Sequence, residues 1–431
     1  MKYTAKEVLQ FTRENDVKFI RLAFSDIYGA LRNLSIMPTE LEKAFDQGIV
    51  FDATAISGFD RTAGSLVLKP DPTTLSILPW RPTQGRVIRM FCHIYHEDGT
   101  PFSGDFRRQL IGAIDELSSL GLRASIGLEC EFYLFELDDK GYATTTPHDR
   151  AGYFDIAPRD RGENVRRDIC LTLETMGLLP ETSHHERGPG QHEISLKYVS
   201  PLDAADQFLT FKSVVKMVAE RNGLHASFMP KPLKAEHGNG MHINLSLYRS
   251  NENLYNANTS QQVLAFTHGV LNQLPALSLF TNPLTNSYSR LRAQHSKKLV
   301  EPDERAWLRL LTGHGDASRI ELRSPDPTLN PYIVFTLMLR AGIAALETSS
   351  ETGYSYQPIS AEMRNKTLDL IPTSLKAAIQ IAEQSSFLSK TIPYLFLEDY
   401  FDVKRNECML VEESTDHYVQ EISHYFDTSI T

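Results

Sequence analysis

The sequence predicts an α+β protein of two domains, a small strand-rich domain over residues 1–100 and a larger domain over residues 101–431. A chain of 431 residues is long enough for two or three domains and a large apolar core. Its hydrophobic content of 41% and charged content of 23% are typical of a globular protein. The turn-rich segment Glu97–Pro101 separates short strands from a region in which longer helices alternate with strands. We therefore place the domain boundary at this segment.

The small domain is expected to combine short strands with two short helices. Thr4 and Glu7 have the spacing of a capping box, which predicts a helix at the N-terminus. Thr39 and Glu42 have the same spacing and predict a second helix that ends at Gly48. Strands are expected where apolar runs lie between turn signals: Val17–Phe24, Ala30–Ile36 and Arg86–Tyr95.

Helices in the larger domain are predicted by apolar stripes with a period of 3.6 residues and by residues that cap or end helices. The predicted helices are Asp105–Gly121, one that ends at Gly177, Pro201–Gly223 and Asn330–Glu347. Most of the chain after residue 347 is expected to be helical as well.

Four further segments alternate between apolar residues on one face and polar or charged residues on the other, a pattern typical of strands. They are Ala124–Leu134, Gln191–Tyr198, Met241–Tyr248 and Ser318–Ser324. In the first, Glu129 and Glu131 lie about 6.6 Å apart on the face opposite the apolar side chains. Two like charges this close are unfavourable unless a cation or a basic group lies between them.

The polar faces of the other strands carry ligands of the same kind. Glu193, His242 and Glu321 each lie on the polar face, and a hairpin through Gly188–Gly190 would bring Glu186 close to Glu193. A sheet with one face in water is the preferred interpretation of any single strand. The repetition in four strands instead favours a metal site, and carboxylates with one imidazole suit Mg²⁺ or Mn²⁺.

Basic residues near the acidic strands indicate what such a site would bind. Arg290, Arg319 and Arg323 could bind a phosphate or a carboxylate in forked geometry. Clustered divalent metals commonly serve phosphoryl transfer. The residues alone therefore indicate a metal-dependent enzyme that acts on phosphates. A zinc hydrolase is disfavoured because the sequence has no HExxH motif.

Charge and cysteine usage argue against several other classes of protein. The net charge of -10 argues against a general nucleic-acid binder. The four cysteines are widely spaced without a CxxC pair, so we expect neither a disulfide framework nor a zinc ribbon. The N-terminal segment lacks an apolar signal core, and the longest apolar run, near Tyr332–Leu339, stops at Arg340. We therefore expect a cytoplasmic protein without a membrane or nucleic-acid partner.

Several longer motifs resemble those of a known family. They follow one another along nearly the whole chain: FDATAISGFDR, GLECEF, HHERGPGQHEISLKY, GLHASFMPKPL, HGNGMHINLSL, TNPLTNSYSRL and SRIELRSPDPTLNPY. These are similar to the successive motifs of bacterial type I glutamine synthetases. The resemblance implies an N-terminal β-grasp domain and a catalytic domain whose antiparallel strands form a funnel surrounded by helices. It also implies a homo-oligomer, a dodecamer of two stacked hexameric rings.

The resemblance also implies a role for each candidate residue. One metal would be held by Glu131, Glu186 and Glu193. The second metal, on the ATP phosphates, would be held by Glu129, His242 and Glu321. The substrate glutamate would be bound by Glu131, Arg290, Arg323 and the backbone at Gly238. The nucleotide would be bound by Asn244, Ser246 and Arg319. The catalytic residues would be Glu186, Arg309, Arg323 and Asp52, the last of which would reach in from a neighbouring subunit to deprotonate ammonium.

The implied reaction has two steps and uses two or more Mg²⁺ or Mn²⁺ ions per subunit, with ATP as a substrate. The γ-carboxylate of glutamate attacks the γ-phosphate of ATP and gives γ-glutamyl phosphate. Ammonia or another amine then displaces phosphate. The metals would neutralise charge during phosphoryl transfer, and the acyl phosphate would make a poor leaving group good.

The sequence departs from the family pattern where the amine is handled. The mobile flap is changed over Arg292–Lys298, and counting places Ser296 at the position of the flap glutamate, followed by two lysines. Glu304 stands where the first of two arginines is expected, and Arg309 stands at the second. Asp52 keeps its place but has lost its serine neighbours. Drift in a mobile loop would explain such changes, but they converge on one subsite, which favours altered amine handling.

Three functions are compatible with this pattern. The first is a glutamine synthetase that uses ammonia. The second is a γ-glutamyl ligase for a larger amine, such as an alkylamine or a polyamine. The third is a non-catalytic paralogue that regulates a true synthetase. The intact metal ligands argue against the third function, and the missing flap glutamate argues against the first. We take glutamate–ammonia ligation as the prediction, with weak use of ammonia.

Overall fold

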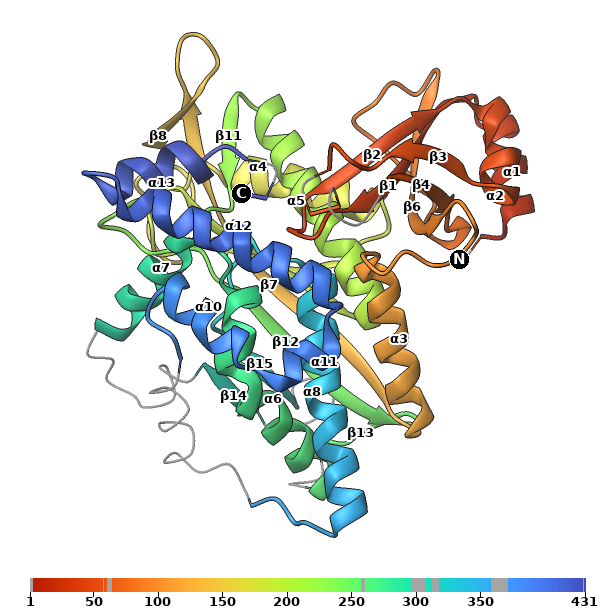
Figure 1. Cartoon of the computed structure of the whole chain (residues 1–431). Helices are drawn as coiled ribbons and strands as arrows, with labels where there is room; N and C mark the ends of the chain where they lie inside the picture. The colour runs from red at the N-terminus through yellow and green to blue at the C-terminus, as the bar shows by residue number, and fades with distance from the viewer. Residues whose placement is uncertain are drawn as a thin grey trace.

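The computed structural model describes residues 3–56, 58–59, 64–256, 260–296, 307–311, 318–357, 371–428 and 430–431, with only the backbone for residues 293–296. Its strands form two sheets, one within residues 17–96 and one within residues 123–322, and the predicted α+β class is confirmed. Figure 1 shows the N-terminal sheet, in red to orange, as a separate lobe beside the larger one. The predicted boundary at residue 100 lies between the sheets and stays a prediction.

The N-terminal sheet has the strand order β2-β1-β6-β4-β3, with β5 also paired to β6. Its strands are β1 (Val17–Ser25), β2 (Leu31–Ile36), β3 (Ile49–Asp52), β4 (Ser65–Pro70), β5 (Ser76–Ile77) and β6 (Arg86–His96). The central strands β1 and β6 run parallel, whereas the other described pairs are antiparallel. The three strands predicted for this region are confirmed, and β3 forms an edge of the sheet.

Both helices predicted for this lobe are confirmed, but the capping box predicted for the second one is wrong. Helix α1 (Ala5–Glu14) begins with the predicted capping box at Thr4. The capping box predicted at Thr39 does not form, because Pro38–Glu40 is a 3₁₀ turn that places Thr39 inside the turn instead of at a cap. Helix α2 (Leu41–Asp46) follows directly, without a side-chain cap.

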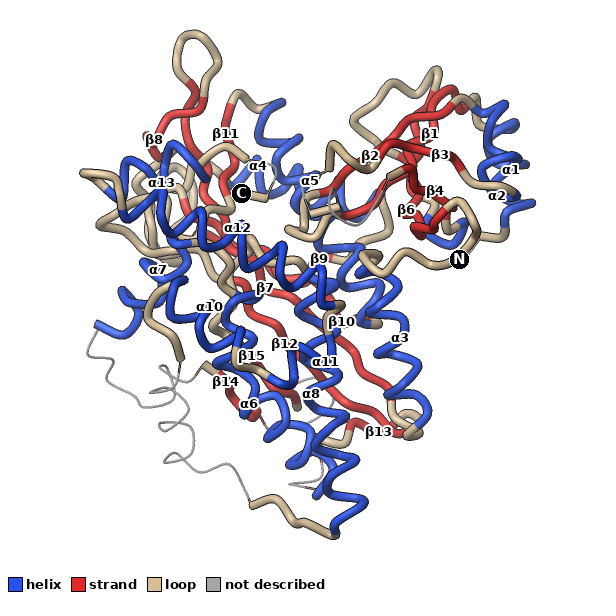
Figure 2. Tube along the Cα trace, in the orientation of Figure 1, coloured by secondary structure: helices blue, strands red, loops and turns tan. Residues whose placement is uncertain are grey.

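The larger sheet has the order β14-β15-β12-β7-β10-β9, with β8 and β11 paired to β7 and β13 paired to β12. Its strands are β7 (Arg123–Leu137), β8 (Ala143–Pro147), β9 (Pro180–His185), β10 (Gln191–Val199), β11 (Leu224–Ser227), β12 (Met241–Arg249), β13 (Glu252–Asn253), β14 (Leu308–Leu311) and β15 (Arg319–Leu322). The pairs described are antiparallel, and the four predicted strands β7, β10, β12 and β15 are confirmed. Figure 2 shows them side by side through the middle of the large lobe.

Helices pack on this sheet and on one another. They include α3 (Phe106–Ser119), α4 (Glu163–Thr175), α5 (Pro201–Arg221), α6 (Gln261–Thr281), α7 (Thr285–Ser296), α8 (Pro331–Thr352), α10 (Leu375–Glu383), α11 (Ser386–Thr391), α12 (Tyr394–Glu412) and α13 (His417–Tyr425). Helix α5 packs on β7 and β11, and α6 packs along α8. Leu128 and Ile243, from neighbouring strands, are fully or almost fully buried beneath these helices. The opposite face of the same strands carries the polar residues.

Two of the described helices, α6 and α8, are long and apolar enough to cross a membrane by length and composition alone. Within their most apolar stretches, 83% of α6 and 61% of α8 is buried inside the protein, as is usual for core helices. The apolar run expected to stop at Arg340 in fact continues as α8, and Arg340 pairs with Glu116 at 2.8 Å. The absence of a membrane partner therefore stays a prediction.

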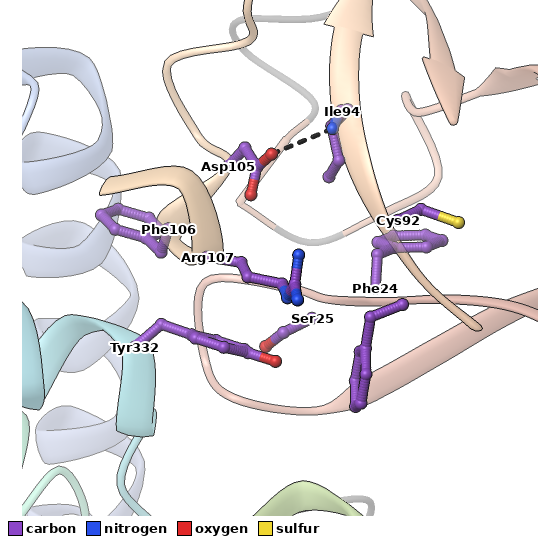
Figure 3. Close-up of a pocket in the computed structure, with 9 residues that line it drawn as sticks. Phe24, Ser25, Cys92, Ile94, Asp105, Phe106, Arg107 and Tyr332 are labelled. Atoms are coloured by element: carbon purple, nitrogen blue, oxygen red, sulfur yellow. Dashed lines mark hydrogen bonds between the residues drawn. The ribbon is translucent and has the colours of Figure 1, made fainter. Parts of the chain in front are cut away.

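The two lobes are joined by buried polar contacts. Arg107 at the start of α3 donates to Asp206 at 2.9 Å and to Asp71 at 3.0 Å, and the Tyr332 hydroxyl donates to Asp206 at 2.6 Å. Figure 3 shows Arg107 and Tyr332 pointing into a small cavity at this junction, where Asp105 accepts from a main-chain amide of β6. These contacts fix the N-terminal sheet against the larger domain.

Candidate functional site

The polar faces of neighbouring strands converge on one side of the large sheet. Directly opposed residues of antiparallel strands lie on the same face. The register opposes Glu129 to His242, Glu131 to Glu193, and Asn244 to Glu321. Because β7 lies between β10 and β12, its two glutamates stand at the centre of this group. Glu186, in the turn between β9 and β10, joins the group beside Glu193.

Glu129, His242 and Glu321 form the first cluster of ligands. Nδ1 of His242 lies 2.9 Å from Oε2 of Glu129 and 3.6 Å from Oε1 of Glu321. One ligand atom from each residue lies within 4.8 Å of the others. Asn244 donates to Oε1 of Glu129 at 3.0 Å and accepts from Nε of Arg319 at 2.7 Å. The residues predicted for one metal thus lie together, and hydrogen bonds through Asn244 fix the position of Glu129.

Glu186 and Glu193 form a second cluster with His184. Oε1 of Glu193 lies 3.5 Å from Nε2 of His184, and Oε1 of Glu186 lies 3.9 Å from Nδ1 of the same ring. Glu131 was predicted as the third ligand of this metal. Its Oε2 accepts from Nε2 of Gln191 and from the amide of Gly240, both at 2.9 Å. Glu131 therefore stands at the edge of this cluster with its orientation fixed.

Burial and mutual repulsion dominate the electrostatics of these carboxylates. Burial, together with the charges of Glu193 and Glu186, raises the pKa of Glu131 to about 7. Burial also raises the pKa of Glu186. Burial acts in the same direction on Glu129, but the hydrogen bonds from His242 and Asn244 and the positive charges of His242 and Arg319 together outweigh it, and the pKa of Glu129 is lowered. A cation between the carboxylates would relieve the repulsion, so the arrangement fits a divalent metal site.

Two of the predicted arginines face Glu321. Nε of Arg323 lies 3.4 Å from Oε1 of Glu321, and Nη1 of Arg309 lies 3.6 Å from Oε2. Arg309 comes from β14, directly opposite Glu321 in the register. The side chains of Arg323 and Arg309 are 25% and 24% exposed, so both cations can meet an anion that approaches this face.

Arg290 is buried behind the glycine loop that precedes β12. It is 1% exposed, and its guanidinium donates to the main-chain oxygens of Ser324 at 2.7 Å and Arg323 at 3.2 Å. A Cβ at Gly240 would come within 2.7 Å of Nη2 of Arg290, and a Cβ at Gly238 would come within 2.4 Å of a main-chain oxygen. A side chain at Gly238 would clash with the backbone, and one at Gly240 would displace the Arg290 guanidinium. The predicted contact of Arg290 with glutamate stays a prediction.

The loop Gly238–Gly240 contains two glycines but is fixed by Asn239. This side chain is 0% exposed and donates to the main-chain oxygens of Ser227 at 3.3 Å and Met229 at 2.9 Å. The main-chain amide of Asn239 also donates to the main-chain oxygen of Pro230 at 2.7 Å. The glycines thus serve close packing, and the loop presents a defined backbone to the site.

The residues predicted to contact the nucleotide lie deeper than expected. Ser246 is 0% exposed and donates to the main-chain oxygen of Ser318 at 3.1 Å. Asn244 is 2% exposed and connects Glu129 to Arg319. Both side chains hold neighbouring strands together, and their predicted contacts with the nucleotide stay predictions.

Asp52 is not brought to the acidic face. It ends the edge strand β3 of the N-terminal sheet, where it is exposed and accepts from the amide and hydroxyl of Thr54. Figure 1 shows β3 in the lobe opposite β12 and β15. The altered flap is only partly covered: Ser296 ends α7 with its backbone alone described, and the predictions for Lys297, Lys298 and Glu304 lie outside the described residues.

Two residues of the site were missed from the sequence. His184 lies on β9 opposite Glu193 and two residues before Glu186, a spacing that could have revealed it. Gln191 is 1% exposed, and its Nε2 contacts Glu131 and the main-chain oxygen of Gly238 at 3.2 Å. Gln191 lies two residues before Glu193 on the predicted strand, so alternation already placed it on the polar face, although its partners come from distant segments.

Comparisons with known proteins agree with this geometry. Residues 16–97 match the family model "Glutamine synthetase, beta-Grasp domain", and residues 103–423 match "Glutamine synthetase, catalytic domain". The glutamine synthetase of Clostridium saccharobutylicum is 40% identical over 406 residues, 91% of this chain and 92% of the relative.

Solved structures of two related proteins share the fold. The Plasmodium falciparum glutamine synthetase has a TM-score of 0.83 at 22% identity, with 99% of each chain covered. A protein described as GmaS, solved without ligand, has a TM-score of 0.80 at 26% identity, with 97% of this chain and 99% of the other covered. The predicted β-grasp domain and the catalytic domain that follows it are thereby confirmed as folds.

Proposed function

This chain belongs to the glutamine synthetase family of ATP-dependent glutamate–ammonia ligases, and we propose that it works through γ-glutamyl phosphate on the acidic face of the large sheet. The observation that carries the proposal is the convergence of the predicted ligands on this face: Glu129, Glu131, Glu186, Glu193, His242 and Glu321. A solvated sheet face does not gather largely buried carboxylates in this way, because each one makes ionisation of the next less favourable.

The family implies a divalent metal and ATP, and the donors present fit Mg²⁺ or Mn²⁺. Glu129, His242 and Glu321 would hold one ion. Glu186 and Glu193 would hold a second, with His184 or Glu131 beside them. Bound there, the ions would neutralise charge on the phosphates of ATP and favour phosphoryl transfer.

The cationic side chains at the site would bind and orient the anionic substrates. Arg323 and Arg309, partly exposed beside Glu321, are the groups best placed to hold the transferred phosphoryl group or a carboxylate of glutamate. Arg290 would act mainly through the loop Gly238–Gly240, because its guanidinium already donates to two main-chain oxygens. The loop would present its backbone to the substrate glutamate.

Asp52 would serve the acidic face of a neighbouring subunit. Its exposed position on an edge strand, in the lobe away from β12, supports this arrangement. The proposed assembly is a homo-oligomer of two hexameric rings, in which each N-terminal lobe completes the next site. A cytoplasmic location and the absence of a nucleic-acid partner are part of the same proposal.

The acceptor is ammonia, used weakly, and a larger amine is the second candidate. Ser296 in place of the flap glutamate favours the second candidate, because it removes a carboxylate that would draw a proton from ammonium. A non-catalytic role is disfavoured by the complete set of acidic ligands.

The test is phosphate release by the purified protein with ATP and Mg²⁺, in the presence and absence of glutamate. Ammonia, methylamine, ethylamine and polyamines are supplied in turn as acceptors. We expect release that requires both glutamate and an amine. Release that ignores glutamate would contradict the proposed ligase reaction, and the acceptor with the highest kcat/KM identifies the amine.

A further inference from the structure

A second layer of titratable residues lies directly beneath the acidic face. In the strands β9 and β10, His184 and Glu193 face the site, so their neighbours His185 and His192 face the opposite way. His185 and His192 are both 0% exposed, and their rings lie 4.8 Å apart. Asp149, which is 4% exposed, joins them from the segment that follows β8. The proposed function uses none of these three residues.

Asp149, His185 and His192 have the composition of a metal site but not its electrostatics. The Asp149 carboxylate already accepts from the amides of Ala151, Gly190 and Arg161 and from His185. Nδ1 of His192 lies 2.8 Å from the Arg166 guanidinium, a fixed cation that would repel a metal ion. These groups therefore form a hydrogen-bonded network.

This network makes hydrogen bonds to both ends of the turn that carries Glu186. Oδ1 of Asp149 accepts from Nε2 of His185 at 3.0 Å and from the amide of Gly190 at 2.9 Å. The other ring nitrogen of His185, Nδ1, lies 2.7 Å from the main-chain oxygen of Glu186 and donates to it. A single carboxylate oxygen thus ties the residue before Glu186 to the last residue of the turn.

The turn has little other freedom. Gly190 has a φ of +68°, and a Cβ there would come within 2.8 Å of the main-chain oxygen of Leu134. The Glu186 amide donates to the oxygen of Gln191 at 2.7 Å, and Gly188 donates to the Gln191 side chain at 3.0 Å. The Glu186 backbone is thus held on one side by His185 and on the other by Gln191. Its carboxylate lies beside Glu193.

We infer that Asp149, through His185, is a positioning residue that sets the Glu186 carboxylate for metal binding in the cluster with Glu193. The inference rests on the proposed function, which assigns Glu186 and Glu193 to one of two ions. Residues that orient a ligand in this way typically contribute about 10–100-fold to metal affinity. Without Asp149, the turn loses both anchors at once.

The test measures Mn²⁺ binding to the purified protein without nucleotide. The electron paramagnetic resonance signal of free Mn²⁺ is the readout, because it decreases as the ion binds. The wild type should show two classes of site, and Glu193→Ala should remove one of them. Asp149→Asn, which keeps the shape but removes the charge, should weaken that same class about 10–100-fold and leave the other class unchanged.

Asp206→Asn is the matched control. Asp206 lies in α5, is 8% exposed and pairs with Arg107 at the junction of the lobes, outside the turn and its network. The Asp206→Asn variant should have a lower melting temperature than the wild type, as Asp149→Asn should. Both classes of Mn²⁺ site should keep their affinity. Equal loss of Mn²⁺ affinity in the control, or unchanged binding in Asp149→Asn, would overturn the inference.

A second variant tests the inference if Asp149→Asn does not fold. His185→Gln removes the same link from the other side and should reproduce the selective loss. If neither variant folds, the network is required by the fold and the inference is wrong. If wild-type protein shows no Mn²⁺ site that depends on Glu193, the proposed function fails first, and the two failures are thereby distinguished.

Discussion

Glu131 lies at the centre of the acidic face, and its surroundings illustrate how the site is held at the scale of single residues. Gln191 and the Gly240 amide both donate to the same carboxylate oxygen, so its direction is fixed although it repels its neighbours. Burial and the nearby Glu193 and Glu186 raise its pKa, which is the signature of negative charge without a counter-ion. A bound cation would turn this repulsion into attraction, which couples metal binding to the local stability of the site.

Replacing Glu193 by Ala tests the metal role of this cluster. We expect loss of Mg²⁺-dependent turnover by at least about 100-fold, because the loss of a direct ligand exceeds the cost of losing a residue that only orients one. The measurement is glutamate-dependent phosphate release across a Mg²⁺ titration.

Glu136→Ala is the control for the same kind of change. Glu136 lies on β7 but on the face opposite Glu131, where its side chain is 44% exposed and 3.8 Å from Arg161. It should retain near wild-type activity. Full activity in Glu193→Ala would remove Glu193 from the site.

The face of each predicted ligand on β7, β10, β12 and β15 followed from alternation alone, because side chains of a strand change sides at every residue. His184 obeys the same rule, but it was overlooked because its strand, β9, is short and was not recognised. Alternation also places Gln191 on the polar face beside Glu193, but Asp149 could not be found this way, since its partner His185 is 36 residues away in the chain. Their roles depend on tertiary packing that no local pattern records.

At the scale of elements, the loop between β11 and β12 is a rigid part of the site. Arg290 on α7 packs against Gly238 and Gly240, and Gln191 on β10 reaches the oxygen of Gly238. The loop therefore connects two elements, α7 and β10, that are distant in sequence. Its precise backbone path determines where the substrate glutamate would lie.

Gly240→Ala tests this arrangement. The new Cβ would lie 2.7 Å from Nη2 of Arg290, so this guanidinium must move, and its displacement would disturb Glu131, whose Oε1 would be 3.4 Å from the new Cβ. We expect the KM for glutamate to rise about 10–100-fold, since small displacements at a reacting centre have effects of this size. Steady-state kinetics at saturating ATP measure it.

Gly112→Ala is the matched glycine substitution. Gly112 lies inside α3, and its nearest neighbour would be 3.7 Å from the new Cβ. This change should stabilise the helix by about 0.5–1 kcal/mol and leave the KM for glutamate unchanged. An unchanged KM in Gly240→Ala would show that the loop does not position glutamate.

The flap after α7 provides a separate test of amine use. A general base typically contributes about 10²–10⁴-fold, so the lack of a carboxylate at Ser296 should appear as a high KM for ammonia. Ser296→Glu should lower that KM, and Ser296→Gln, which adds the same bulk without the charge, should not. Ordinary ammonia kinetics in the unmodified protein would contradict this explanation.

Elements were predictable where local signals were strong. The capping box at Thr4 and the Asn330 cap of α8 formed as predicted, because no competing signal lies beside them. At Thr39, Pro38 began a 3₁₀ turn one residue earlier and displaced the cap. Strand β14 was missed because its four residues, Leu308–Leu311, are defined by pairing with β15 and not by a pattern of their own.

At the scale of the whole molecule, the position of Asp52 implies a shared site. Within one chain, Asp52 lies away from the acidic face. In an assembly, Asp52 of one subunit can lie beside the acidic face of another. The purified protein should therefore be a large ring oligomer by light scattering, and an active monomer would contradict the proposed sharing.

Mixing two inactive variants tests the sharing directly. Asp52→Ala and Glu193→Ala oligomers, dissociated and reassembled together, should regain activity, because some sites then combine an intact Asp52 with an intact acidic face. Each variant reassembled alone should stay inactive. No recovery in mixed oligomers of confirmed composition would place both residues in the site of one chain.

The transfer of an oxygen atom tests the central claim most directly. If the γ-carboxylate of glutamate attacks the γ-phosphate of ATP, the bridging oxygen comes from glutamate and leaves with phosphate when the amine attacks the carbonyl carbon. Glutamate labelled with ¹⁸O in its γ-carboxylate should therefore yield phosphate that carries one ¹⁸O, detected by mass spectrometry of the product. Phosphate without label, formed alongside the amide product, would contradict the γ-glutamyl phosphate mechanism proposed for the acidic face.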